Sequence, residues 1–291
     1  MPRVEEMVER VWPGCDARIE SLGGGITNRN FKVSVDGGVY VFRIGGRDTE
    51  LLGIDRRAEH EASLAAAAVG VGPEVIAFIE PEGYLITRYI EGEIVVPEAI
   101  REPEPLRRVA QALRAIHGGP PIPARFDAFR VVEAYAATAI AHGIAVPAPF
   151  ERARDLAAEV ERARGPVPER PCHNDLLSAN FIDDGSRIRI VDWEYAGMGD
   201  IYFDLANFAV NNGLTAADTT ELLHAYFGAV TPQHQRALTL MRFMSDFREA
   251  MWGVVQQALS DLGFDFGAYA EQHFERLERT AADRAFRRAL T

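Results

Sequence analysis

The sequence predicts an α+β fold of two lobes. An antiparallel-sheet N-terminal lobe is expected over residues 1–91 and a mainly helical C-terminal lobe over 92–291. Three observations predict this division. Up to Ile90 the apolar residues gather in short runs between turn residues, whereas after Gly92 they recur every three or four positions. The chain of 291 residues, 47% of them hydrophobic, is also long enough to bury a sizeable core.

The elements of the N-terminal lobe follow from spacing and turn residues. A helical period predicts a helix over 4–11, which Pro13-Gly14 ends. The Glu- and Ala-rich segment from Asp55 to Val69 predicts a second helix, ended by Gly70 to Pro73. Short apolar runs bounded by turns predict five strands, at 18–21, 31–35, 39–44, 75–79 and 84–90.

The C-terminal lobe has helical periodicity, with one exception. A short strand over 188–191 precedes Asp192. The lobes join near Tyr89 to Gly92. Two helical faces are predicted, formed by Leu106, Val109, Ala110, Leu113 and Ile116, and by Leu156, Ala157 and Val160.

Composition limits the partners. A net charge of −12 argues against nucleic acid or an anionic membrane, suits a cationic ligand, and serves solubility equally well. Apolar stretches such as 65–69 are too short for a bilayer span and the N-terminus does not resemble a signal peptide, so we expect a soluble cytoplasmic protein, monomer or homodimer. The two cysteines, Cys15 and Cys172, predict reduced thiols rather than a disulfide framework or a zinc site.

The segment from His173 to Asn180, followed by Asp192-Trp193-Glu194, is the most informative stretch. Phosphoryl transfer needs a carboxylate that orients the acceptor hydroxyl and accepts its proton, an amide oxygen on Mg²⁺, and a second carboxylate on the metal. Asp175, Asn180 and Asp192 fit these roles in that order. Such residues also cap ordinary turns, but the whole set at fixed offsets favours the catalytic interpretation.

A glycine-rich loop between the first two predicted strands contains Gly23, Gly24, Gly25, Thr27 and Asn28. Small residues let backbone N–H groups approach phosphates, and the two polar side chains add donors. Three glycines alone more often form a turn.

Together these segments resemble the choline/ethanolamine kinase branch of the aminoglycoside phosphotransferase superfamily, which has a protein-kinase-like fold. The resemblance covers nearly the whole chain, and its motifs are the glycine loop, Cys172 to Asn180, Asp192 to Gly197, and the stretch around Trp252 and Tyr269. It implies an ATP-dependent, Mg²⁺-dependent kinase acting on a small-molecule acceptor.

The resemblance also assigns the nucleotide side. The only lysine, Lys32, lies too early to bind the phosphates, so Arg43 is the expected anchor, and a guanidinium suits a phosphate. Its partner should be Glu59, with Glu61 as the alternative. Adenine should contact the backbone of Arg88 and Ile90, with Ile86 against the ring.

Two further positions are expected to support the catalytic loop. Asp204 resembles the family's buried aspartate that braces the loop, and His173 is expected to hold it by hydrogen bonds rather than act as a base. His117 is expected to be a structural residue at a helix end.

The acceptor pocket is expected beside the late helices, where Phe247, Trp252 and Tyr269 could face an ammonium group, although core packing is an equal alternative. Trp252 aligns with one of the family's two choline-pocket tryptophans, but Glu249 replaces the other. A carboxylate there favours a primary amine over trimethylammonium. Glu194 is expected beside either the metal or the ammonium group.

Three hypotheses follow. The first is a choline or ethanolamine kinase, and the second is a kinase for aminoglycosides, amino sugars or other small alcohols. The third is a nucleotide-binding regulatory protein without turnover. It predicts that catalytic groups are missing, whereas Asp175, Asn180 and Asp192 are all present. No Gly-x-Gly-x-x-Gly opens a helix after the first strand, which argues against a Rossmann dehydrogenase. The sequence does not distinguish ATP from GTP as the phosphoryl donor, nor one bound metal ion from two.

Overall fold

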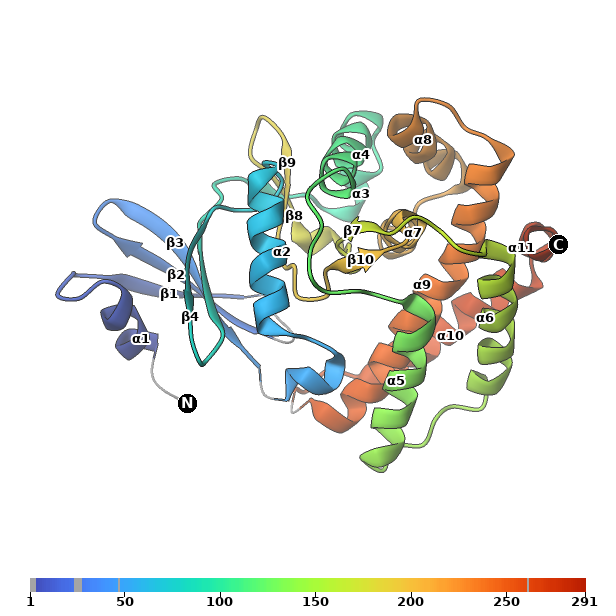
Figure 1. The fold of residues 1–291 in the computed structure, drawn as a ribbon, viewed down its shortest axis with the longest axis horizontal. Helices are drawn as coiled ribbons and strands as arrows, with labels where there is room; N and C mark the ends of the chain where they lie inside the picture. Colours follow the sequence, from blue (N-terminus) through green and yellow to red (C-terminus); the bar gives the residue numbers. More distant parts are fainter. Residues whose placement is uncertain (1–3, 24–27, 47, 261) are drawn as a thin grey trace.

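The fold was analysed in a computed structural model that describes residues 4–23, 28–46, 48–260 and 262–291. A five-stranded antiparallel sheet lies at one end and a helical body at the other, with helix α2 (Arg56–Ala68) between them (Figure 1). The predicted fold class is therefore confirmed.

The N-terminal sheet has the strand order β1-β2-β3-β5-β4, and every neighbouring pair is antiparallel. β2 and β3 form a hairpin that turns at Asp36 and Gly37, whose φ angles of 50° and 74° suit a two-residue turn. The expected hairpin is thus present, although the last strand ends at Arg88 rather than Ile90. The bounds are β1 Arg18–Leu22, β2 Asn28–Val35, β3 Gly38–Gly45, β4 Val75–Ile79 and β5 Tyr84–Arg88.

Helix α2 begins where the Asp55 side chain accepts hydrogen bonds from the N–H groups of Arg57 and Ala58 at 2.8 and 3.1 Å. Its buried alanines, among them Ala62 and Ala66, belong to the large core that the C-terminal helices also share. The sheet has its own smaller core, to which α1 (Val4–Val11) contributes Met7 and Val8. The division at residues 91 and 92 remains a prediction, because α2 packs across it.

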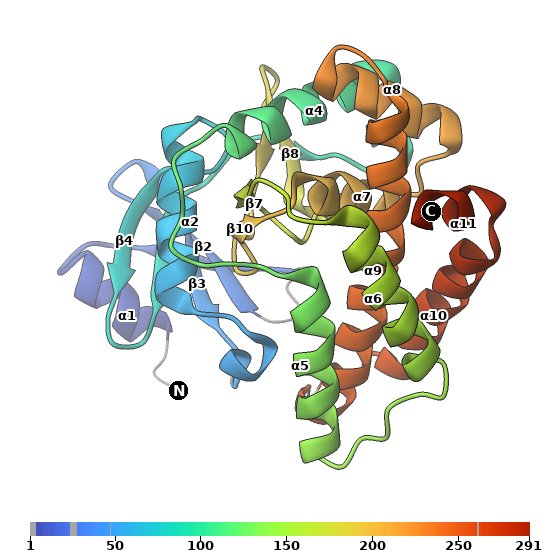
Figure 2. The ribbon, with the colours of Figure 1, turned by 45° about the vertical axis from the view of Figure 1, so that its right-hand side comes forward.

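The helical part is arranged around α9 (Pro232–Leu259), which contacts α5, α7 and α10. Figure 2 shows α5 and α6 along this helix. Both predicted amphipathic faces are found, on α4 and α6. The other helices are η1 Thr49–Leu52, α3 Pro97–Ile100, α4 Pro103–His117, α5 Ala128–Ala141, α6 Phe150–Arg164, η2 Ser178–Asn180, α7 Ile201–Asn211, α8 Ala216–Phe227, α10 Phe266–Ala282 and α11 Arg284–Leu290.

Short strands in the helical part flank the two loops that carry the motif residues, 173–180 and 191–196. β6 pairs with β8 and β8 with β9, while β7 pairs with β10, all antiparallel. The predicted strand before Asp192 is β9. The bounds are β6 Glu93–Ile94, β7 Arg170–Cys172, β8 Phe181–Asp183, β9 Ile188–Ile190 and β10 Gly197–Gly199.

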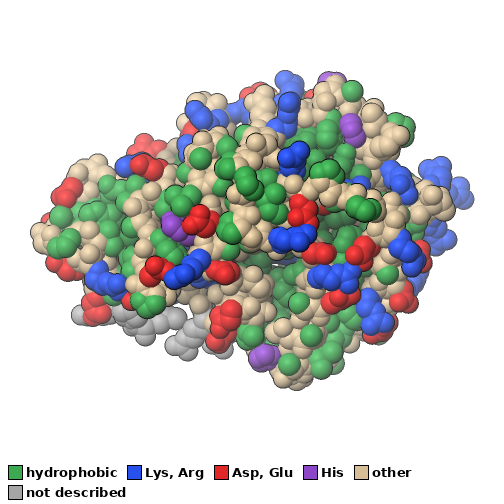
Figure 3. All heavy atoms as spheres, in the orientation of Figure 1, with side chains coloured by type: hydrophobic (Ala, Val, Ile, Leu, Met, Phe, Trp, Pro, Cys, Tyr) green, Lys and Arg blue, Asp and Glu red, His purple; other side chains and the backbone are tan. Residues whose placement is uncertain are grey.

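The surface carries both signs of charge, and acidic and basic side chains are interspersed on the face in Figure 3. Among the described helices, none is both long enough and apolar enough to cross a membrane.

Candidate active site

Side chains of helix α7 accept hydrogen bonds from the backbone of the loop over 173–180. The Asp204 carboxylate accepts hydrogen bonds from the backbone N–H groups of His173 and Asn174 at 2.8 and 2.6 Å. One turn later, Asn207 Oδ1 accepts the N–H of Leu176 at 2.6 Å. Both side chains lie on one face of α7 because they are three residues apart. The expected contact between Asp204 and the loop is present in the structure.

His173 ties this loop to the next one. Its Nε2 lies 3.0 Å from the carbonyl oxygen of Val191, and the Asp175 N–H donates to its Nδ1 at 3.2 Å. These contacts require the tautomer with a proton on Nε2. Burial lowers the pKa of His173, so the ring is held neutral. The geometry agrees with the expected supporting position.

A buried trio lies behind the loop, where ligand atoms of His117, Cys172 and Asp204 all lie within 4.8 Å of one another. Asp204 already accepts the loop N–H groups, and His117 contacts it at 3.0 Å and the Tyr226 hydroxyl at 2.7 Å. Burial raises the pKa of the Cys172 thiol. We therefore interpret the trio as packing around the brace, with His117 at the end of α4 as expected.

The two loops bring Asp175, Asn180 and Asp192 close together. Asn180 Nδ2 donates to the Asp175 carbonyl oxygen at 2.9 Å, which leaves its Oδ1 available. Asp192 has a φ of 71°, and Asn174 a φ of 67°. Residues other than glycine rarely adopt such backbone angles, and residues that do are concentrated at functional sites. Burial raises the pKa of Asp175 although Arg248 opposes the shift.

Arg43 on β3 joins the two lobes at this point. Its Nη1 lies 2.6 Å from Glu59 Oε1 on α2 and 2.7 Å from Asp192 Oδ1. Burial alone would lower the pKa of Arg43, but Asp192 and Glu59 raise it, so the side chain stays charged. Of the two glutamates considered from the sequence, the structure pairs Glu59 with Arg43.

A cavity of about 270 Å³ opens beside this ion-pair cluster. It brings together six of the residues expected at the nucleotide and metal, namely Gly23, Arg43, Arg88, Ile90, Asn180 and Asp192. Apolar walls from Val41, Leu85 and Trp193 complete it. The expected contributions of Gly24, Gly25 and Thr27 lie outside the described residues.

One detail of the adenine prediction changes. Ile86 does not line the cavity: it is fully buried in the core of the sheet, because side chains alternate along β5 and its neighbours Leu85 and Thr87 face the cavity instead. The N–H of Arg88 donates to the Glu74 carbonyl oxygen at 2.8 Å. The contacts of adenine with the backbone of Arg88 and Ile90 remain a prediction, in which the base would use backbone groups other than this N–H.

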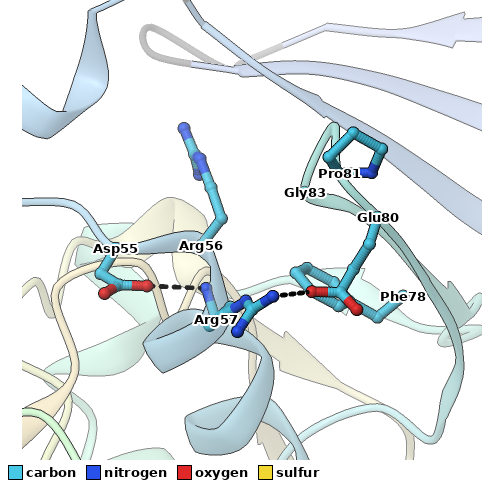
Figure 4. Close-up of a pocket in the computed structure, with 7 residues that line it drawn as sticks. All are labelled: Asp55, Arg56, Arg57, Phe78, Glu80, Pro81 and Gly83. Atoms are coloured by element: carbon cyan, nitrogen blue, oxygen red, sulfur yellow. Dashed lines mark hydrogen bonds and ion pairs between the residues drawn. The ribbon is translucent and has the colours of Figure 1, made fainter.

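A second hollow, of about 530 Å³, lies on the outer side of α2 and β4 (Figure 4). It is crossed by an exposed ion pair between Arg57 and Glu80 at 2.5 Å. None of the expected catalytic residues lines it. Its size alone gives no reason to regard it as the reaction site.

On the other side of Asp175, helices α9 and α10 supply the residues expected at the acceptor. Glu249 is 2% exposed and accepts hydrogen bonds from Arg248 at 2.8 Å, from Asn207 at 3.1 Å and from the Tyr269 hydroxyl at 2.9 Å. Burial would raise the pKa of Glu249, but Arg248 lowers it. Glu249 is therefore an ionised carboxylate that is paired with Arg248 and hydrogen bonded on both oxygens.

The aromatic residues divide into two groups. Trp252 Nε1 donates to the Tyr195 hydroxyl at 3.0 Å, and the ring centroids of Trp252 and Tyr269 are 5.6 Å apart. Phe247 instead points into the core, where it is fully buried against Phe150 and other rings. Of the two alternatives that the sequence left open for Phe247, the structure supports core packing.

Comparisons with known proteins agree with this geometry. Protein LicA from Haemophilus influenzae is 26% identical over 259 residues, covering 85% of this chain and 75% of that protein. Ethanolamine kinase 2 from Homo sapiens is 29% identical over 297 residues, covering 90% and 76%. A solved choline/ethanolamine kinase family protein from Mesorhizobium loti has a TM-score of 0.85 and 32% identity, covering 99% and 97%. A model described as the phosphotransferase enzyme family matches residues 18–242.

The chain belongs to the phosphotransferase enzyme family. The similarity to choline and ethanolamine kinases places it in that branch, as its motifs predicted, and makes it a small-molecule kinase of the choline kinase-like type.

Two arginines of this phosphotransferase escaped the sequence analysis. Arg56 reaches Glu59 at 2.7 Å and Glu194 at 3.2 Å, and its position three residues before Glu59 in the first turn of α2 was an available signal. Arg248 reaches Asp175 at 3.1 Å. The adjacent charges Arg248-Glu249, directly before the apolar run from Ala250 to Val255, were the corresponding signal.

The structure also relates two residues of this phosphotransferase that were predicted separately. Asn28 Nδ2 donates to Glu194 Oε2 at 2.8 Å, and Arg56 Nη2 donates to Asn28 Oδ1 at 3.0 Å. Burial raises the pKa of Glu194, and the nearby Asp192 adds to the shift. Glu194 thus connects the end of the glycine loop to α2.

Proposed function

We propose that this phosphotransferase moves the γ-phosphoryl group of Mg-ATP to the hydroxyl of a small cationic alcohol, with choline and ethanolamine as the leading candidates. One observation carries the proposal: Asp175 contacts both sides of the site. Its carbonyl oxygen accepts a hydrogen bond from Asn180, which lines the cavity, and its carboxylate pairs with Arg248, which also pairs with Glu249. A base in that position can accept a proton from a hydroxyl on one side while the phosphoryl donor lies on the other.

The chain's own residues would divide the work. Arg43, fixed by Glu59, would bind the phosphates and counter the charge on them. Asp175 would orient the acceptor hydroxyl and take its proton as its oxygen bonds the γ-phosphorus and the bond from that phosphorus to the departing ADP oxygen breaks. Asp204 would hold the loop so that Asp175 stays in position.

Mg²⁺ suits the donor set. Asn180 Oδ1 and the Asp192 carboxylate are hard oxygen ligands, and Asn180 Nδ2 is already used by the Asp175 carbonyl oxygen, which orients its oxygen as the free atom. When bound, the metal would neutralise charge on the β- and γ-phosphates. Glu194 is a weaker candidate ligand than the sequence suggested, because it is engaged by Arg56 and Asn28.

The acceptor side favours a hydrogen-bonding group. A quaternary ammonium needs an aromatic enclosure, whereas Glu249 stands at one expected aromatic position and is hydrogen bonded on both carboxylate oxygens. Ethanolamine is therefore favoured over choline. The same polar pair, Arg248 and Glu249, supports a second candidate function, phosphorylation of an amino sugar or aminoglycoside.

The test is ADP release from Mg-ATP across choline, ethanolamine, amino sugars, aminoglycosides and simple alcohols, with Asp175→Asn as the blank. We expect turnover on an amine-bearing alcohol and none in the blank, which should still bind ATP. Full activity of Asp175→Asn would refute the assigned base. Silence across the panel with ATP bound would favour a regulatory nucleotide-binding protein.

A further inference from the structure

Arg56 is the first residue of α2, and its side chain is only 15% exposed. Its Nη1 lies 2.7 Å from Glu59 Oε2 and 3.2 Å from Glu194 Oε2. Its Nη2 donates to Asn28 Oδ1 at 3.0 Å and to Thr49 Oγ1 at 3.1 Å. One guanidinium therefore joins α2 to the end of the glycine loop, to η1 and to the loop after β9.

Two glycines leave room for this side chain. A Cβ atom added at Gly45, on β3, would lie 2.8 Å from Arg56 Nε and 2.9 Å from its Nη2, and one added at Gly83 would lie 2.8 Å from Arg56 Cβ. Gly83 has a φ of 72°, which favours glycine by itself, whereas Gly45 is not among the residues with a positive φ. The space that the guanidinium takes up therefore accounts for glycine at position 45.

Glu59 lies between two arginines, with one on each carboxylate oxygen. Arg43 contacts Oε1 at 2.6 Å, and Arg56 contacts Oε2 at 2.7 Å. Arg43 lines the cavity beside Asp192, whereas Arg56 does not. A carboxylate that is bound on both oxygens cannot rotate without losing a charged hydrogen bond. Arg56 therefore restricts the direction in which Glu59 holds Arg43.

Arg56 also shares the carboxylate charge around Arg43. It contacts Glu59 and Glu194, while Arg43 contacts Glu59 and Asp192. Burial alone would lower the pKa of Arg56, but Glu59 and Glu194 raise it, so the side chain stays charged. Both ion pairs of Arg43 use Nη1, and a guanidinium has two further nitrogens with N–H groups that suit a phosphate. The orientation of Arg43 then decides whether those groups face the nucleotide.

The next residue, Arg57, has none of these contacts with the site. Its side chain is 79% exposed and pairs with Glu80 at the surface. Figure 4 shows Arg56 and Arg57 pointing in different directions from α2. Because exposed pairs contribute little to stability, Arg57 provides a matched comparison for Arg56.

Resting on the proposed function, we propose that Arg56 is a positioning residue for the phosphoryl donor. It fixes Glu59, and through Glu59 the direction of Arg43, and it ties Asn28 at the end of the glycine loop to the same cluster. It acts on the phosphates through these residues and not by touching the nucleotide. Disturbing Arg56 therefore costs affinity for the phosphates and not for the nucleoside.

Two variants that conserve charge test this in the binding of Mg-ATP and of adenosine, measured by titration calorimetry without an acceptor. Arg56→Lys keeps the cation but removes the planar fork of N–H groups. Gly45→Ala keeps Arg56 and displaces its guanidinium, which is the end of a flexible side chain and can give way. In both variants Kd for Mg-ATP should rise about tenfold, as for the loss of one charged hydrogen bond, and Kd for adenosine should change less than about twofold.

Arg57→Lys is the matched control and should bind both ligands like the wild type. A double variant tests the route through Arg43. Because Arg43→Ala already lacks the anchor, adding Arg56→Lys should weaken Mg-ATP binding by less than about a further twofold. Fully additive losses would mean that Arg56 acts independently of Arg43 and would overturn the inference. Melting temperatures of all variants report folding.

The remaining outcomes are distinct. Unchanged Mg-ATP affinity in Arg56→Lys overturns the inference and leaves the proposed function intact. Equal losses for Mg-ATP and adenosine assign Arg56 to the general shape of the cavity and also overturn it. If Arg56→Lys does not fold, Gly45→Ala decides by the same two criteria. A wild-type protein that does not bind Mg-ATP overturns the proposed function and the inference together.

Discussion

Replacing Asp204 by asparagine tests whether the position of the loop over 173–180 depends on the buried Asp204 carboxylate. The carboxylate accepts the N–H groups of His173 and Asn174 at 2.8 and 2.6 Å, and His117 Nε2 lies at 3.0 Å. Asparagine is nearly the same size but has one oxygen. With that oxygen toward Asn174, its NH₂ group faces the two other donors.

The magnitude follows from these contacts. Two hydrogen bonds to a charged acceptor are lost, and each contributes about 1.5–3 kcal/mol, so the free energy of unfolding should fall by about 3–6 kcal/mol. Turnover should fall as well, because Asp175 follows His173 and Asn174 along the chain. A misplacement that raises the barrier by about 1.4 kcal/mol lowers kcat about tenfold.

Equilibrium unfolding in urea gives the first quantity, and ADP release at saturating ATP gives the second. Asp218→Asn is the matched control, since it alters only a surface capping box with Thr215, for which we expect at most about 1 kcal/mol. The reasoning is refuted if Asp204→Asn unfolds and turns over like Asp218→Asn.

Three further predictions concern other contacts. Arg43→Ala should raise the apparent KM for ATP at least about tenfold through loss of a charged phosphate contact, measured by steady-state kinetics, and an unchanged KM would move the anchor elsewhere. Glu249→Gln should raise the acceptor KM without changing ATP affinity; an unaltered acceptor KM would remove Glu249 from recognition. Arg108→Ala breaks a paired contact with Asp183 at 2.6 and 2.7 Å and should lower the free energy of unfolding by about 1 kcal/mol in urea, with no loss of turnover. A loss of kcat there would indicate a role in the reaction.

Local structure could be predicted because it depends on neighbours in the chain. The hairpin at Asp36 and Gly37 follows from a turn sequence between two apolar runs, and the start of α2 follows from a capping Asp55. The motif residues Asp175, Asn180 and Asp192 were recognisable for a similar reason, since their offsets along the chain are fixed by the loops that carry them.

The sequence was least informative about which way a side chain faces. Ile86 was expected against the adenine ring, yet it is fully buried in the core of the sheet, and Phe247, for which core packing and the acceptor pocket were both open, is fully buried as well. A residue on a strand or helix that is buried on both sides meets protein on either side, so periodicity does not say which side it faces. Only packing against the sheet and against α5 and α6 selects one of them.

The sequence by itself determined the family, the order of most elements and the residue types that we propose for phosphoryl transfer. The tertiary structure decided which charges meet. Arg43 and Asp192 are 149 residues apart in the chain, and Arg248 and Asp175 are 73 apart. Such pairs leave no periodic trace in the sequence, because their geometry depends on how β3, the loop after β9 and helix α9 pack in space.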